Sequence, residues 1–272
     1  MASAGEPDRG GLADPPGPRD IGVGGGAGLA SGLFGVGGGL VLVPYLVLVR
    51  GWEQKRAQAT SLVMVAMAAT AGLIGYALAD SVAWLAAVPI LAGGLGGAVL
   101  GSALVTRLRS WILQVAFSAI LVIAALRLLV AGGAGDPSAD PRGVTLGLAL
   151  AYLASGVAMG MLSALFGIGG GILLVPLLVA VFGFDQRLAA GTSLAVMGLI
   201  AIIGAVRQSR QGMTEWRTGA LLGVGGAVGA LVGARLALLL PLTVLTWLFA
   251  ALLVFVAVRL AISGWRARDS AT

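Results

Sequence analysis

Two glycine-rich stretches hold the residues of this chain best suited to binding chemistry. They read GLFGVGGGLVLVP and ALFGIGGGILLVP, and their glycines are Gly35, Gly37, Gly38, Gly39, Gly167, Gly169, Gly170 and Gly171. Glycine reaches positive φ at little cost and leaves its backbone N–H uncovered. A helix that begins just after such a break points its unpaired donors and its positive dipole end at it. Each stretch therefore predicts a concave set of N–H donors that could bind an anion.

A hydroxyl pair follows each glycine stretch at the same spacing. The pairs are Thr60-Ser61 and Thr192-Ser193. Hydroxyls that face the same cavity could donate to the same anion. Two plainer interpretations stay open: the hydroxyls could bond to carbonyls of their own helices, and the glycines could serve only a sharp turn or close packing. The repetition of the whole pattern favours a binding site.

Other kinds of chemistry lack the residues that they need. The chain has no Cys and no His, and Lys55 is its only lysine. Thiolate or imidazole metal sites, disulfides and catalysis by Cys or His are excluded. A serine hydrolase would lack a base. We expect no enzyme, no metal site and no cofactor. The arginines stand singly or in pairs between apolar segments, which is typical of membrane-protein loops and not of a nucleic-acid surface.

The elements that position these residues are apolar segments long enough to cross a membrane. Hydrophobic residues make up 58% of the 272 residues and charged residues only 10%, whereas soluble domains have about 45–50% and about 25%. The composition predicts an all-α polytopic membrane protein. Residues 1–20 are polar and lack the features of a signal peptide, so we expect a disordered tail.

The chain is an internal duplication. An offset of 132 residues aligns Ser31–Leu62 with Ser163–Leu194 without a gap, and 19 of the 32 aligned positions are identical. We predict repeat 1 over 21–131, a linker over 132–143, repeat 2 over 144–263 and a C-terminal tail over 264–272. Each repeat has about four hydrophobic segments. The first segment of each is interrupted at the glycines, into limbs of roughly 21–34 and 40–49 in repeat 1.

Two topologies are compatible with these segments. If every segment crosses once, the chain has eight straight spans and parallel repeats, and its basic residues divide almost evenly between the two sides. If each first segment is a re-entrant hairpin, the repeats are inverted and twelve basic residues lie on the side of the termini against three on the other. The positive-inside rule favours the hairpins, with both termini in the cytoplasm.

Arg127 and Arg259 are 132 positions apart and lie toward the ends of their hydrophobic segments. Such arginines usually extend to the membrane interface. The alternative is that they attract an anion at each mouth of its path.

The two glycine stretches, followed by QATS and AGTS, resemble the sulfite exporter TauE/SafE family, also called the 4-toluene sulfonate uptake permease family, over about 21–263. The resemblance implies a multi-pass permease of the inner (plasma) membrane, whose partners are the lipid bilayer and a small anionic substrate such as sulfite, a sulfonate or sulfoacetate. It does not fix the exact substrate, the direction of transport, the coupling ion or the oligomeric state. A non-transporting membrane scaffold or assembly factor is the alternative.

Overall fold

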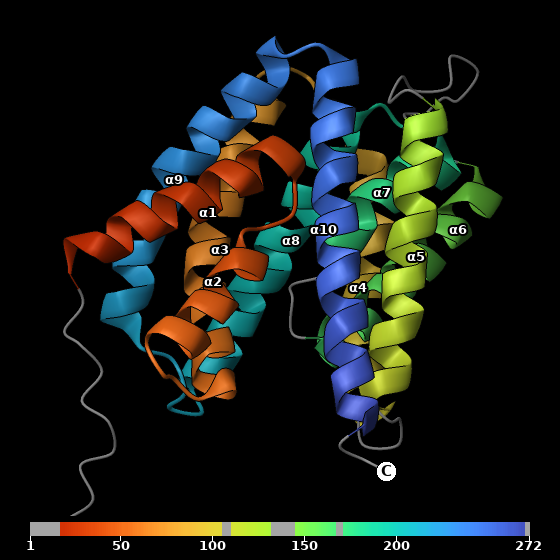
Figure 1. Ribbon diagram of the computed structural model, residues 1–272. Helices are drawn as coiled ribbons and strands as arrows, with labels where there is room; N and C mark the ends of the chain where they lie inside the picture. The colour runs from red at the N-terminus through yellow and green to blue at the C-terminus, as the bar shows by residue number, and fades with distance from the viewer. Residues whose placement is uncertain (1–16, 105–109, 132–144, 167–170, 270–272) are drawn as a thin grey trace, which may run out of the picture.

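The structure, a computed structural model, describes residues 17–104, 110–131, 145–166 and 171–269. The described residues form helices and no strand (Figure 1). The helices are α1 (Pro18–Phe34), α2 (Gly39–Pro44), the π-helical turn η1 (Tyr45–Val49), α3 (Gln54–Ala77), α4 (Trp84–Leu104), α5 (Ser110–Ala131), α6 (Leu146–Phe166), α7 (Gly171–Phe182), α8 (Gln186–Ser209), α9 (Trp216–Leu239) and α10 (Leu242–Asp269). The prediction of an all-α protein is confirmed.

Four of the described helices are long and apolar enough to cross a membrane. They are α3, α8, α9 and the part of α10 from Leu242 to Arg259. Each has at least 18 residues, close to the roughly 20 that a hydrocarbon core requires. Many large apolar side chains also face outward, among them Leu78 and Val130, as expected where lipid replaces water. The predicted polytopic membrane protein is therefore supported by length, composition and exposure.

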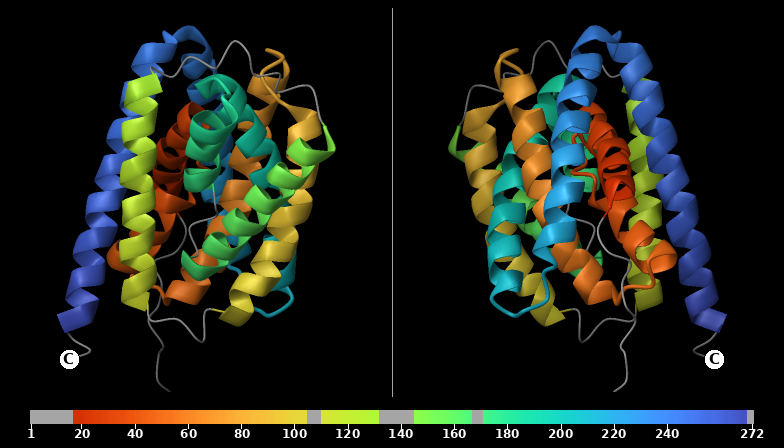
Figure 2. Two further views of the ribbon diagram at one scale, coloured as in Figure 1. Left: turned by 90° about the vertical axis from the view of Figure 1, so that its right-hand side faces the viewer. Right: turned by 90° about the vertical axis from the view of Figure 1, so that its left-hand side faces the viewer.

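The long helices form a bundle with both parallel and antiparallel neighbours: α3 is parallel to α9, whereas α8 is antiparallel to α3 and α5 is antiparallel to α10. In Figure 1, α3, α5 and α9 run upward, and α4, α8 and α10 run downward. The views in Figure 2 show α5 and α10 side by side along one flank of the bundle. Hydrogen bonds agree with these directions: Glu215 before α9 bonds to Thr60 near the start of α3, and Arg187 at the start of α8 bonds to Ala237 and Leu240 at the end of α9.

The first apolar segment is a hairpin and not a straight span. Helix α1 ends at Phe34, the backbone turns through Gly35–Gly38, and α2 with η1 returns to Val49. The two ends of this segment meet, because Arg50 forms an ion pair with Asp20 at 3.6 Å. This contact is incompatible with a straight first span. The break lies between the two limbs expected from the sequence.

Two boundaries differ from those expected from the sequence. Helix α1 begins at Pro18 and α10 runs to Asp269, so helix extends into both expected tails. Asp20, expected in a disordered tail, lies in the first turn of α1 and is buried. Its carboxylate accepts the N–H of Gly17 at 3.0 Å, which stabilises the start of the helix. Pro18 at the first helical position has no N–H to leave unpaired.

Small residues let the helices approach closely. A side chain at Gly28 of α1 would overlap the backbone of Gly226 of α9, and one at Gly97 of α4 would overlap Val157 of α6. Glycine-rich runs at 93–104 and 223–234 thus permit close helix packing at both interfaces. These contacts bring α1 against α9 and α6 against α4, and the first hairpin's break is buried inside the bundle.

Helices in the two halves of the chain begin at matching positions. α2 and α7 start at Gly39 and Gly171, α3 and α8 at Gln54 and Gln186, α4 and α9 at Trp84 and Trp216, and α5 and α10 at Ser110 and Leu242. Each pair is separated by the same 132 positions as the sequence motifs.

Candidate functional site

The first glycine break has the backbone that its sequence predicts. Gly35, Gly37 and Gly38 have φ of 71°, 81° and 67°, values that other residues rarely adopt. The Gly35 N–H donates to the Ser31 carbonyl and closes α1, while Gly38 is the residue at which α2 begins. Gly39 has no left-handed backbone and is the first helical residue. All four glycines are buried.

Three consecutive N–H groups in this break have no acceptor among the residues that the structure describes. The Gly39 N–H donates to the Gly37 carbonyl at 2.8 Å, and the Gly38 carbonyl accepts from Val41 and Leu42. The N–H groups of Val36, Gly37 and Gly38 have no acceptor among the described residues. Buried backbone donors are nearly always paired, so such a run marks a place where an anion or water would bind.

The two glycine motifs meet inside the bundle. Gly167, Gly169 and Gly170 lie outside the described residues, but Gly171 is described, is buried and begins α7. A Cβ built on Gly171 would lie 3.0 Å from the Gly35 carbonyl oxygen. The start of α7 is therefore in direct reach of the first break.

Gly37 lies between matching positions of α3 and α8. A Cβ added there would meet the side chains of Met197 and Val65. These two residues are 132 positions apart, as the motifs are. Gly37 is thus near residues that the sequence alignment of the two halves pairs with each other.

The four hydroxyls predicted at the site have different surroundings. Ser193 donates to the Gly35 carbonyl at 2.8 Å, so it contacts the break directly. Ser61 donates to the Gln58 carbonyl of its own helix. Thr60 accepts the Glu215 N–H and Thr192 accepts the Ala83 N–H, each at 3.0 Å. Among described contacts, only the hydroxyl of Ser193 reaches the glycine motif, and the two threonines hold the segments that precede α9 and α4.

Ser31 is a candidate that the sequence analysis did not single out. Its side chain is fully buried, and its hydroxyl has no partner among the described residues. It lies one turn after Ala27, whose carbonyl oxygen would be 2.9 Å from a Cβ on Gly38. The available signal was its recurrence, since Ser163 opens the second motif at the same place. Met197 gave no such signal, because its counterpart is Val65.

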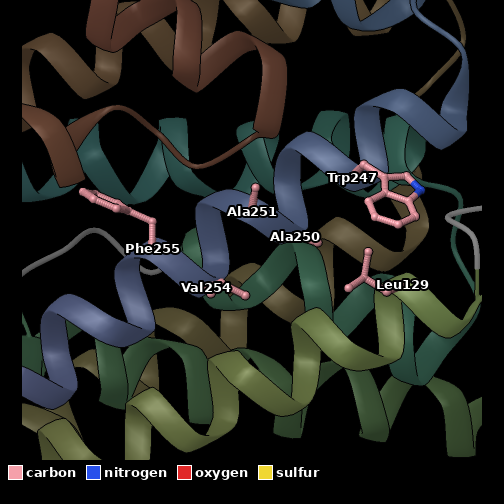
Figure 3. Close-up of a pocket in the computed structure, with 6 residues that line it drawn as sticks. All are labelled: Leu129, Trp247, Ala250, Ala251, Val254 and Phe255. Carbon is pink, nitrogen blue, oxygen red and sulfur yellow. The ribbon is translucent and has the colours of Figure 1, made fainter.

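Arg127 and Arg259 lie away from the break, on α5 and α10, and both are exposed. Between these helices is a cavity of about 390 Å³ (Figure 3). Its lining is apolar, comprising Leu129, Trp247, Ala250, Ala251, Val254 and Phe255. Such a lining offers an anion no polar partner.

Comparison with known proteins identifies the family of this chain. The profile of the family described as "Sulfite exporter TauE/SafE" matches residues 4–128 and 152–272. A probable membrane transporter protein of Xylella fastidiosa is 33% identical over 218 residues, covering 80% of this chain and 83% of the relative. The probable membrane transporter protein YunE of Bacillus subtilis is 25% identical over 235 residues, covering 77% and 84%.

Proposed function

The chain belongs to the sulfite exporter TauE/SafE family and is a multi-pass membrane transporter, and we propose that it moves a small sulfur-containing oxyanion of the sulfite, sulfonate or sulfoacetate class. Transport would be secondary or facilitated. The substrate would be held where the two glycine breaks meet. The observation that carries this proposal is the buried run of three N–H groups at Val36–Gly38 beside Gly171 of the second motif.

The donors at the break suit an anion that must be released again. Its polar groups are backbone N–H groups, with the Ser31 hydroxyl nearby. Each contact with a helix dipole stabilises an anion by about 0.3–1 kcal/mol when exposed and up to about 2 kcal/mol when partly buried. Several such contacts together would hold an oxyanion at the break through neutral donors alone.

We also propose that the two halves are inverted repeats. The matching helix starts support this, as do two hydrogen bonds that the halves exchange, Thr60 with Glu215 and Thr192 with Ala83. The two threonines are separated by the repeat offset of 132 positions, and so are their two partners. Helices α5 and α10, which occupy matching positions, are antiparallel neighbours (Figure 2). A two-fold axis in the membrane plane explains all three features.

Inverted hairpins offer a simple transport cycle. The glycines of the first break are buried, so this conformation is closed around the break. The first hairpin returns to the end of the molecule where α3 begins, and α7 leads to the opposite end, where α8 begins (Figure 1). Each hairpin would open the central site to its own side of the inner membrane, with both termini in the cytoplasm.

Flux into liposomes tests the function. Purified protein is reconstituted and supplied with sulfite, sulfate, thiosulfate or an alkyl sulfonate. We expect saturable flux of sulfite or the sulfonate above that of protein-free liposomes. Absence of flux for every one of these anions, from a monodisperse preparation, would favour the membrane scaffold instead.

A further inference from the structure

The base of the first hairpin contains a buried ion pair. Asp20 in α1 and Arg50 after η1 are 3.6 Å apart between Oδ1 and Nη1, and their side chains are 1% and 9% exposed. Asp20 uses its other oxygen to accept the Gly17 N–H. Oδ1 makes no hydrogen bond to any described residue. The carboxylate is thus held near the guanidinium by charge, at a distance longer than a hydrogen bond.

A buried tryptophan completes this group. The Arg50 guanidinium carbon lies 5.8 Å from the centre of the Trp52 ring, and that of Arg56 lies 4.8 Å from it. Trp52 is 6% exposed, and its indole N–H has no partner among the described residues. Arg56 forms an ion pair with Glu215 at 3.0 Å, and both of these side chains are more exposed than those of Asp20 and Arg50. A cation and an unused N–H donor are therefore buried together at the hairpin base.

The second hairpin shows that the fold does not require this ion pair. The positions 132 residues after Asp20, Arg50 and Trp52 are Tyr152, Phe182 and Phe184. The Tyr152 ring is 4.7 Å from Phe182 and 6.2 Å from Phe184, centre to centre. At the base of the second hairpin, three packed aromatic rings take the place of the ion pair and tryptophan. Aromatic packing stabilises without the desolvation that buried charges suffer, so the charges in the first hairpin point to a binding role.

We infer that Arg50 and Trp52 form an oxyanion-binding site at the base of the first hairpin, and that Asp20 occupies it until substrate arrives. Sulfite and sulfonates, like a carboxylate, present two oxygens to one guanidinium. The arriving anion displaces the Asp20 carboxylate, breaks the contact between the hairpin's two ends, and so loosens the hairpin that leads to the central break. This rests on the proposed function and assigns its binding step on one side of the membrane.

The site has no counterpart at the second hairpin, where the matching residues are aromatic. Binding from the side of the first hairpin should therefore depend on Arg50, and binding from the opposite side should not. The transporter would be asymmetric although its halves are alike.

Three variants test the inference with sulfite as the probe. Arg50→Gln removes the cation, Asp20→Asn removes the competing carboxylate, and the double variant D20Y/R50F installs the residues of the second hairpin. Arg210→Gln changes an exposed arginine at the same end of the bundle and controls for general loss of positive charge. Sulfite binding is measured by calorimetry on purified protein, and sulfite KM is measured from each side of oriented proteoliposomes.

We expect Arg50→Gln and the double variant to weaken sulfite binding at least tenfold, with the double variant still monodisperse. Asp20→Asn should tighten binding several-fold, and Arg210→Gln should leave it unchanged. KM should rise in Arg50→Gln only when sulfite is supplied on the side of the first hairpin. Wild-type binding in both the Arg50→Gln and double variants would overturn the inference, while wild-type flux would still support the proposed function. Arg50-dependent binding without flux would keep this site and refute the transport proposal.

Discussion

Replacing Gly38 by alanine is expected to stop most transport while leaving the protein folded. Gly38 has φ of 67°, where alanine costs about 1–2 kcal/mol. Its new Cβ would lie 2.9 Å from the carbonyl oxygen of Ala27 and 3.1 Å from Cε of Met64. The methionine can rotate away, but the carbonyl belongs to a packed helix. The break itself must therefore shift, and the Val36–Gly38 donors with it.

Gly212→Ala separates this shift from the cost of the backbone angle. Gly212 has φ of 71° in the segment between α8 and α9, and a Cβ there meets nothing within 4 Å. Gly212→Ala therefore carries only the free-energy cost of placing alanine in a left-handed backbone, without a steric clash. If the shift in Gly38→Ala removes one hydrogen bond to a charged ligand, binding weakens by about 1.5–3 kcal/mol. That corresponds to a loss of roughly tenfold to a hundredfold in affinity.

The assay compares sulfite flux in proteoliposomes at equal protein density, together with thermal unfolding in detergent. Both variants should lower Tm, and only Gly38→Ala should lose flux. Equal flux in the two variants, or wild-type flux in Gly38→Ala, would show that the break does not bind the substrate and that its glycines serve only the turn.

Two further predictions concern the hydroxyl at the break and the topology. Ser193→Ala should reduce sulfite flux severalfold, because the buried Gly35 carbonyl loses its donor at a cost of about 1–3 kcal/mol. The control Ser209→Ala removes a similar bond at an exposed site and should leave flux unchanged. Equal effects in the two variants would contradict a special role for Ser193. The chain has no native cysteine, so single cysteines can report the topology by labelling. Cysteines at Gln54 and Gln211 should be labelled from one side of the membrane and a cysteine at Ala79 from the other. Labelling of the Gln54 and Gln211 positions from opposite sides would exclude the inverted arrangement.

The sequence was most informative where a local rule decides the structure. Glycines at 35, 37 and 38 predicted a left-handed break, and the structure has it there. Apolar segments long enough to cross a membrane predicted the long helices. The hairpin followed from an indirect signal, the distribution of basic residues across the membrane, and the contact of Asp20 with Arg50 agrees with it.

Partners between distant segments could not be predicted. Asp20 stood in a polar, proline-rich stretch, and only the return of the chain to Arg50 explains why it is buried within a helix. Ser61 and Ser193 are matching residues of matching helices, and no rule based on their spacing indicated that Ser193 would bond to a glycine carbonyl of the other half. Met197 beside Gly37 likewise depends on how α8 crosses the first hairpin.

The threonines show why a duplicated sequence hides such partners. Thr60 bonds to Glu215, and Thr192 bonds to Ala83, so each threonine reaches across to the half that does not contain it. Among the described residues, a search within one repeat would find only the Leu188 carbonyl, which accepts from the Thr192 hydroxyl at 2.7 Å, and would miss both N–H donors from the other half. Each bond fixes the start of a helix in the other half, α9 or α4, and α1 and α6 pack against those same helices. Each hairpin therefore packs on a helix of the other half, and the start of that helix is held by a threonine from the hairpin's own half, so the two halves interlock at both ends of the bundle.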